Sequence, residues 1–188
     1  MEVMVYSIGF DARQSEGGNA PLPPSGDPAD YGGTYVGSSR TQLLDGTRSY
    51  GVSVFNKETG SWMWHRTYDV YESGDADNDG TVDGIEAAGR MANDLNNLPE
   101  DGDIVVFVTT QDEPQTHRLS NGLESAMYGI GASSSVFGAS DFKYRSAYLL
   151  IGSPALSQGE AYVEEYKGSV DRSPHAWVKE IYTLKYRP

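Results

Sequence analysis

The sequence contains no cysteine and few basic residues. Its 188 residues include 14 Lys plus Arg against 27 Asp plus Glu, which gives a formal net charge of −13. Without cysteine the chain forms no disulfide, offers no thiolate nucleophile and holds no cysteine-ligated zinc or iron–sulfur site. Nucleic acids and anionic membranes attract cationic surfaces, so a chain this acidic is expected to bind neither.

Long apolar runs are also missing. No stretch approaches the roughly 18 consecutive apolar residues that mark a membrane span, so no membrane insertion is expected. The sequence starts with Met-Glu-Val-Met-Val-Tyr-Ser, which lacks the basic start and the continuous apolar core of a secretory signal peptide. A chain of this length buries roughly 70% of the surface that its unfolded form exposes. We therefore expect one globular domain over residues 1–188.

Catalytic motifs are the third absence. His65, His117 and His175 do not have the spacing of zinc ligands, no serine has a Gly-x-Ser-x-Gly setting, and no phosphate-binding glycine loop is present. Many carboxylates remain, but no spacing singles out a pair for glycoside hydrolysis. The sequence therefore predicts a protein that is not an enzyme.

What is present favours a mainly β fold with two helices. The 22 glycines and 13 tyrosines are typical of short strands and turns. Apolar residues spaced by three and four predict helices over 85–98 and 119–130, and the Gly- and Pro-rich segment 15–33 predicts a long exposed loop. Strands are predicted over 2–10, 34–44, 47–56, 62–71, 104–110, 147–151 and 176–184. The run over 104–110 is almost wholly apolar and predicts a central strand buried on both faces.

The segment 75–86 has the ligand spacing of a calcium-binding loop. Acidic residues occupy positions 1, 3, 5, 9 and 12 of twelve, with glycine at position 6 and an aliphatic residue at position 8. Because the preceding segment 65–71 has the pattern of a strand, we expect a strand–loop–helix site that holds a structural Ca²⁺ rather than a sensor. The alternative is an exposed acidic loop that favours the positive end of the next helix. The predicted ligands are Asp75, Asp77, Asp79, Thr81, Asp83 and Glu86.

An aromatic stripe follows the predicted turn at 56–60. In a regular strand, Trp62 and Trp64 share one face with Arg66 and Tyr68. Aromatic faces beside charged groups can stack on sugar rings, so both tryptophans are candidate carbohydrate-binding residues. The alternative is that this face belongs to the core.

Four blocks of sequence, in order, resemble one family. They are 48–60, Arg-Ser-Tyr-Gly-Val-Ser-Val-Phe-Asn-Lys-Glu-Thr-Gly; 66–69, Arg-Thr-Tyr-Asp; 101–114, around Ile-Val-Val-Phe-Val-Thr-Thr; and 144–152, Tyr-Arg-Ser-Ala-Tyr-Leu-Leu-Ile-Gly. Over about 46–168 the chain is similar to the ILEI domain of the interleukin-like EMT inducers. This domain also forms the carbohydrate-binding stem of protein O-mannose N-acetylglucosaminyltransferase.

The resemblance implies a fold and a site. The expected fold class is α+β, mainly β: a compact sandwich-like pair of β-sheets with two flanking helices and a strand–calcium loop–helix insertion. The family is not known for catalysis by this domain. In the stem domain, the residues that match Asp112 and Arg145 contact the sugar, and a carboxylate with a guanidinium can bind its hydroxyls. The alternative is a structural salt bridge between the two, and Ser146 stands where the family has Asp.

Two functions follow as expectations. The first is a non-catalytic carbohydrate-binding or adhesion module, extracellular or on a virion surface, such as a phage tail or head appendage that contacts host glycans. The second is a structural virion or protein-interaction domain that binds no sugar. A signalling ligand is a third option, which the missing cysteines and the calcium-like loop disfavour. The expected partners are a glycan or other virion or surface proteins, and oligomer formation is left open.

Overall fold

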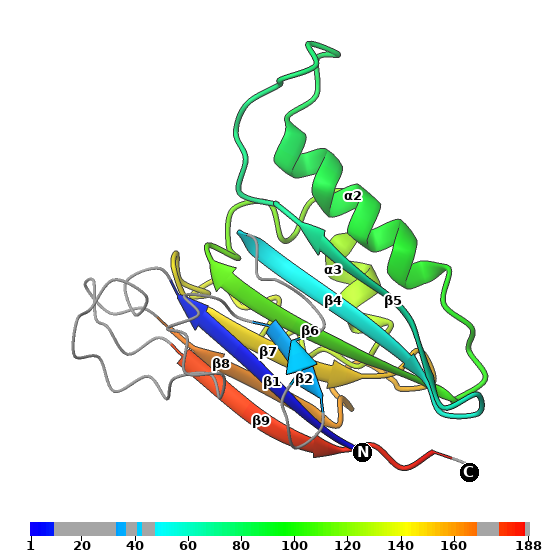
Figure 1. Ribbon diagram of the computed structural model, residues 1–188. Helices are drawn as coiled ribbons and strands as arrows, with labels where there is room; N and C mark the ends of the chain where they lie inside the picture. The colour runs from blue at the N-terminus through cyan, green and yellow to red at the C-terminus, as the bar shows by residue number, and fades with distance from the viewer. Residues whose placement is uncertain (10–32, 37–40, 43–47, 169–176, 187–188) are drawn as a thin grey trace.

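The computed structural model describes residues 1–9, 33–36, 41–42, 48–168 and 177–186. Within these residues the chain is mainly β, with two short helices, as the sequence predicts (Figure 1). The elements are β1 (Glu2–Gly9), β2 (Gly33–Val36), β3 (Thr41–Gln42), β4 (Ser49–Asn56), β5 (Ser61–Tyr68), α2 (Asp83–Asn96), β6 (Ile104–Asp112), α3 (Leu123–Tyr128), β7 (Ala147–Gly152), β8 (Val163–Lys167) and β9 (Trp177–Thr183). None of the described helices is both long enough and apolar enough to cross a bilayer.

Five strands form a central antiparallel sheet in the order β5-β4-β6-β7-β8. β6 lies in its middle, and its residues from Ile104 to Gln111 are all buried. This confirms the central, doubly buried strand that the apolar run predicts.

A second group of strands, β3-β2-β1-β9, forms the other layer. β1 pairs antiparallel with both β2 and β9. The layers join where the end of β1 runs parallel to the end of β6, through the pairs Ile8–Gln111 and Gly9–Asp112. Hydrogen bonds therefore link the nine strands of the described residues, while these strands face one another as two sheets. The predicted pair of sheets with flanking helices is confirmed.

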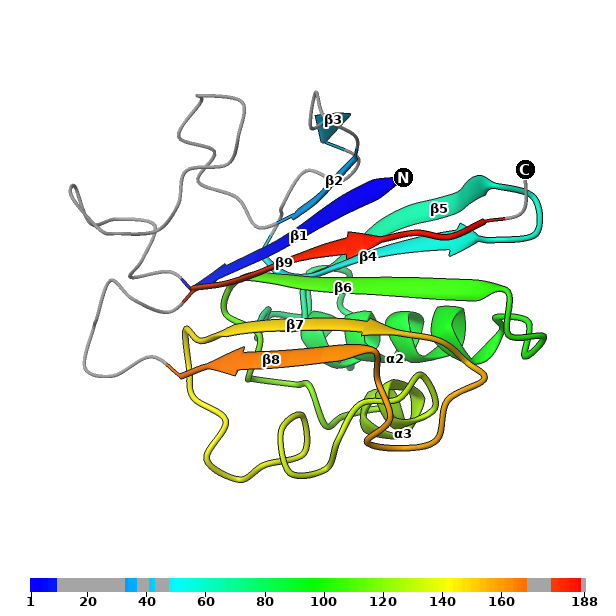
Figure 2. The ribbon, with the colours of Figure 1, turned by 90° about the horizontal axis from the view of Figure 1, so that it is seen from below.

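The central sheet has a hydrophobic core on each face. Alternate β6 residues separate the two: Val106 and Val108 pack with α2 and α3, whereas Val105 and Phe107 pack with β1 and β9. Figure 2 shows the resulting three layers, with the helices on one side of the central sheet and β1 and β9 on the other. The period-two alternation of a strand makes this division possible.

The structure shows that the prediction of a shared face for Trp62 and Trp64 is wrong. The pairing of β4 with β5 shifts between Val54, which faces Trp64, and Phe55, which faces Trp62, so Met63 is the extra residue of a β-bulge. A bulge reverses the alternation of side chains, so the two tryptophans lie on opposite faces. The ring of Trp62 packs in the core between the sheets, and Trp64 packs on the helix side.

Other elements differ less from expectation. β8 was not predicted, because Val-Glu-Glu-Tyr-Lys has no alternation of apolar residues. Its Glu164 points inward and accepts hydrogen bonds from Tyr148 Oη (2.8 Å) and Ser133 N (2.9 Å). The helix predicted over 119–130 is shortened to α3, and the strand predicted over 34–44 is divided into β2 and β3. Apart from Gly33, the loop predicted over 15–33 lies outside the described residues.

Candidate functional site

The ends of four strands of the central sheet meet on one side of the molecule. β6 ends at Asp112, β5 ends at Tyr68, β4 begins at Ser49 and β7 begins at Ala147. Antiparallel pairing places these ends together, as the pair Ser49–Gln111 shows. We call this side the β6 end.

The backbone at the β6 end is strained. Ser49, Asp112 and Arg145 have φ angles of 76°, 64° and 57°, in the left-handed region that residues other than glycine seldom adopt. Such conformations cost of order 1–3 kcal/mol each, and they concentrate at functional sites. Two of these three residues, Asp112 and Arg145, are the ones that the family resemblance indicates.

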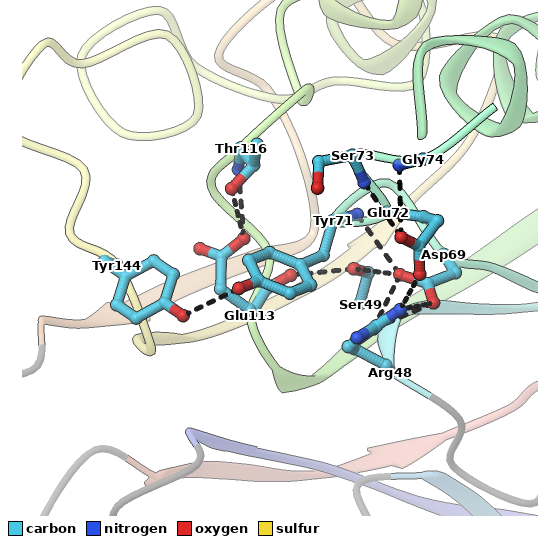
Figure 3. Close-up of polar contacts among 10 residues, drawn as sticks. All are labelled: Arg48, Ser49, Asp69, Tyr71, Glu72, Ser73, Gly74, Glu113, Thr116 and Tyr144. Carbon is cyan, nitrogen blue, oxygen red and sulfur yellow. Dashed lines mark hydrogen bonds and ion pairs between the residues drawn. The ribbon is translucent and has the colours of Figure 1, made fainter. Parts of the chain in front are cut away.

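Arg145 belongs to an aromatic cluster at the β6 end. Its guanidinium carbon lies 5.1 Å from the centre of the Tyr144 ring. The Tyr144 hydroxyl donates a hydrogen bond to the Tyr71 hydroxyl at 3.3 Å, and the two ring centres are 6.0 Å apart (Figure 3). That hydrogen bond raises the pKa of Tyr144, so the phenol stays neutral. Arg48 lies on the other side, with its guanidinium carbon 4.7 Å from the Tyr71 ring centre.

These four residues form a surface that is open to solvent. Tyr144 is 42% exposed, and the other three are partly exposed. Two aromatic faces thus lie between two guanidinium groups, beside the end of β6. We call Arg48, Tyr71, Tyr144 and Arg145 the tyrosine–arginine surface. Asp112, which is half-buried, lies at the same end, and both Asp112 and Arg145 also interact with other groups of the chain.

Two carboxylates hold Arg48 in place. Its Nη2 lies 2.6 Å from Asp69 Oδ2 and 2.7 Å from Glu72 Oε2 (Figure 3). The hydrogen bond with Asp69 raises the pKa of Arg48, and the bond with Arg48 lowers the pKa of Glu72. Arg48 and Glu72 are therefore charged at neutral pH. Asp69, the last residue of the family-like block 66–69, orients this arginine through its hydrogen bonds and ion pair.

Buried polar groups fix the loop that follows β6. The carboxylate of Glu113 accepts hydrogen bonds from Gln115 N (2.8 Å), Thr116 N (3.1 Å) and Thr116 Oγ1 (2.7 Å). Ser49 Oγ donates to the Glu113 carbonyl oxygen at 2.7 Å. Arg118 donates from Nε to the Phe137 carbonyl (3.0 Å) and from Nη2 to the Ala139 carbonyl (2.7 Å). These bonds rigidify the segments that carry Asp112 and Tyr144.

The acidic loop lies between β5 and α2, and its predicted acidic ligands converge. Carboxylate oxygens of Asp75, Asp77 and Asp83 lie within 4.8 Å of one another, and those of Asp77, Asp79 and Glu86 do the same. Crowding by Asp79 and Asp77 raises the pKa of Glu86. The loop thus contains two groups of three carboxylates that share Asp77, and carboxylate oxygens are the ligand type that a hard divalent cation prefers.

The backbone of the acidic loop is tightly curved. Gly80 has φ 95°, and the amide nitrogens of Asp79 and Gly80 donate to the Asp75 carboxylate at 3.1 and 3.0 Å. Thr81, the predicted carbonyl ligand, donates its own amide hydrogen to Asp79 Oδ1 at 2.8 Å. The loop leads directly into α2, which begins at Asp83.

Residues 48–154 match the sequence model of the family described as "Interleukin-like EMT inducer", or ILEI. The chain belongs to the ILEI family. No curated protein matches the chain. ILEI domains are non-catalytic modules, and the β-rich fold suits a carbohydrate-binding type of module. The segment that matches the family runs from β4 to β7, whereas all four strands of the second sheet, β1, β2, β3 and β9, lie outside it.

Within this ILEI domain the predicted sugar-binding residues separate into two groups. Asp112 and Arg145 share the β6 end, since Arg145 lies two residues before β7 begins and Leu149 of β7 pairs with Thr109 of β6. Trp62 lies near the opposite end of β5, with its ring centre 5.2 Å from that of Phe55.

Trp64 lies in the middle of β5 and is covered on one face by the guanidinium of Arg66, at 4.8 Å. The structure therefore does not bring the tryptophans together with Asp112 and Arg145. Sequence reasoning missed Arg48, Tyr71 and Tyr144 as site residues. The sequence contained a hint for two of them: Arg48 is the first residue of the first family-like block, and Tyr144 is the first residue of the last one.

Proposed function

We propose that this ILEI domain is a non-catalytic carbohydrate-binding or adhesion module whose glycan binds at the tyrosine–arginine surface. The observation that carries the proposal is the pair Tyr71 and Tyr144, held between the guanidinium groups of Arg48 and Arg145. The CH faces of a sugar stack on aromatic rings. Its hydroxyl and acetamido groups then find charge-assisted hydrogen bonds to arginine and carboxylate.

Asp112 and Arg145 have the central roles in this proposal. Both are held in strained backbone at the β6 end, which fixes their position before a ligand arrives. Ser146 stands where the family has an acidic residue, and its hydroxyl donates to the Lys143 carbonyl at 2.7 Å. Ser146 therefore stabilises the turn before β7, and the sugar contacts fall to Asp112 and Arg145.

We also infer that the acidic loop holds one structural Ca²⁺. Repulsion among its carboxylates, which raises the pKa of Glu86, would be relieved by a divalent cation. Glu72 connects the loop to the sugar site, because its Oε1 accepts from Gly74 N at 3.2 Å while its Oε2 accepts from Arg48. An ordered loop would thereby help to hold Arg48 beside Tyr71. The proposed ligands are Asp75, Asp77, Asp79, Thr81, Asp83 and Glu86.

The setting that we propose is a virion surface, as part of a phage tail or head appendage that contacts host glycans. The absence of cysteine supports it, because a protein that folds in a reducing cytoplasm and leaves in an assembled particle has no use for disulfides. Neighbouring tail or capsid genes would agree with this setting, whereas neighbouring genes for secreted enzymes would contradict it.

Arg145→Asn is expected to weaken glycan binding by about ten- to a hundredfold, since a hydrogen bond to a charged group contributes roughly 1.5–3 kcal/mol. Asparagine tolerates positive φ, so the backbone at position 145 is kept. The measurement is a glycan array followed by titration of the glycans that bind. Lys57→Gln, which removes one positive charge from the β4–β5 turn at the opposite end of the sheet, is the matched control and should bind neutral glycans as the wild type does. The carbohydrate proposal fails if the wild type retains no glycan at any calcium concentration, and a structural or protein-interaction role then takes its place.

A further inference from the structure

A pocket of about 410 Å³ lies far from the β6 end. It is lined by Lys57, Tyr162, Tyr182, Thr183, Leu184 and Lys185. Lys57 belongs to the turn between β4 and β5, Tyr162 precedes β8, and the remaining residues end β9 or follow it. Figure 2 shows the segment after β9 running beside the β4–β5 turn. The volume falls within the range of about 300–1,000 Å³ that is typical of small-ligand sites.

The pocket is cationic in a strongly acidic protein. Its lining contributes two ammonium groups, and in the described part of the chain it contains no carboxylate. Among the described residues, neither Lys57 nor Lys185 forms an ion pair. In a chain of net charge −13, a lining with two ammonium groups and no carboxylate is the kind of site that favours an anion over a cation.

An aromatic wall forms one side of the pocket. The Tyr182 ring packs edge-on against the buried Phe107 at 5.9 Å, and the Tyr162 ring stacks on Tyr182 at 6.0 Å and 28°. Burial raises the pKa of Tyr182, so its hydroxyl stays protonated. Tyr162 is 42% exposed, which leaves it free to contact a ligand. A flat aromatic face contributes to binding a sugar ring but adds little to binding a bare phosphate.

We propose that this pocket binds an acidic sugar of the uronate type, as one residue of an anionic glycan. The carboxylate lies between the ammonium groups of Lys57 and Lys185, and a CH face of the ring contacts Tyr162. Thr183 Oγ1 and the Tyr182 hydroxyl are available for the sugar hydroxyls. The site goes beyond the proposed function: it requires neither Arg145 nor calcium, so either site can be correct without the other.

Titration of the full-length chain with D-glucuronate tests the proposal, with amide NMR signals as the measurement. We expect shifts confined to the neighbourhoods of Lys57, Tyr162 and 182–185. Equal concentrations of D-glucose should cause no shifts there, because the carboxylate is missing. Equal shifts with glucose, no shifts with glucuronate, or binding of inorganic phosphate as tight as that of glucuronate would each overturn the proposal.

Single substitutions sharpen the test. Lys57→Gln and Lys185→Gln should each weaken glucuronate binding by about fivefold, the upper range for one exposed charge pair. Tyr162→Ala should weaken glucuronate but leave any residual phosphate binding unchanged. Lys167→Gln has the same change of charge outside the pocket, and an equal loss with this control would contradict the assignment. Arg145→Asn should leave the titration unchanged, which separates this site from the one at the β6 end.

Discussion

Phe137→Ala is expected to lower the free energy of unfolding by about 3–5 kcal/mol, the range for a buried phenylalanine replaced by alanine. Phe137 is fully buried, and its ring centre lies 6.3 Å from Tyr50, 6.3 Å from Phe142 and 5.4 Å from Tyr148. The substitution removes all three aromatic contacts and leaves a cavity in the core on the helix side of the central sheet. It also loosens the carbonyl that accepts from Arg118 Nε.

Thermal and urea unfolding measure this loss, which corresponds to a fall in Tm of roughly 6–20 °C for a chain of this size. Val136→Ala is the control, because Val136 is only partly buried on the same core. Its cost should stay well below that of Phe137→Ala. An equal loss of unfolding free energy in the two variants would contradict the proposal that the aromatic contacts of Phe137 stabilise this core. Because the same segment leads to Tyr144 and Arg145, we also expect Phe137→Ala to weaken glycan binding.

Removing calcium is expected to lower the Tm by roughly 5–10 °C. A ligand present at a hundred times its Kd stabilises the folded state by about 2.7 kcal/mol, and each kcal/mol shifts the Tm of such a chain by roughly 2–4 °C. The measurement compares thermal unfolding in saturating calcium and in excess chelator. Equal Tm values under both conditions would contradict the calcium proposal.

Glu86→Gln gives this experiment a second signature. The variant should lose the calcium response, since the proposed bidentate ligand is gone. In chelator it should be no less stable than the wild type, because it removes the repulsion from Asp79 and Asp77 that raises the pKa of Glu86. Glu100→Gln, an exposed acid beyond α2, is the matched control and should retain the full response.

Hydrogen exchange locates the effect. On chelation the segment 72–90 should lose protection first, because it contains the loop and the first turns of α2. Uniform loosening across the chain would contradict a local structural site. The amide of Tyr71, which neighbours Glu72, should lose protection after the segment 72–90 does. The size of its loss would show how strongly the ordered loop stabilises the tyrosine–arginine surface.

The sequence predicts those features that depend on local patterns. The apolar run of β6, the three-and-four spacing of α2 and the alternate acids of 75–86 each follow from the geometry of one segment. The structure confirms β6 and α2, and it places the acids of 75–86 in two close groups of three. The bulge at Met63 could not be predicted, because it depends on how β4 and β5 pair across the sheet. β8 could not be predicted for a related reason. Its inward-pointing residue Glu164 accepts hydrogen bonds from Tyr148 and Ser133 in other segments, so the sequence of β8 shows no alternation of apolar residues.

The candidate sugar site shows the same limit. Asp112 and Arg145 were indicated by family-like blocks, but Arg48, Tyr71 and Tyr144 belong to three separate segments of the chain. Only the antiparallel register of β4, β5, β6 and β7 brings them to one end of the sheet. A cluster that arises from register is not visible in any single stretch of sequence.

The pairing of β1 with β9 has a consequence for synthesis on the ribosome. Glu2 pairs with Thr183 and Ile8 with Trp177, so β1 must wait for almost the whole chain before its hydrogen bonds with β9 can form. The segment from β4 to β7 emerges earlier and can build the central sheet and the helix layer first. During that interval β1 lacks its partner β9, so Val3 and Val5 are more exposed than in the folded protein. Pairing between segments so far apart in sequence is slow, and the exposed apolar residues favour aggregation until it is complete. We therefore expect folding in two stages during translation, with the second sheet closing last.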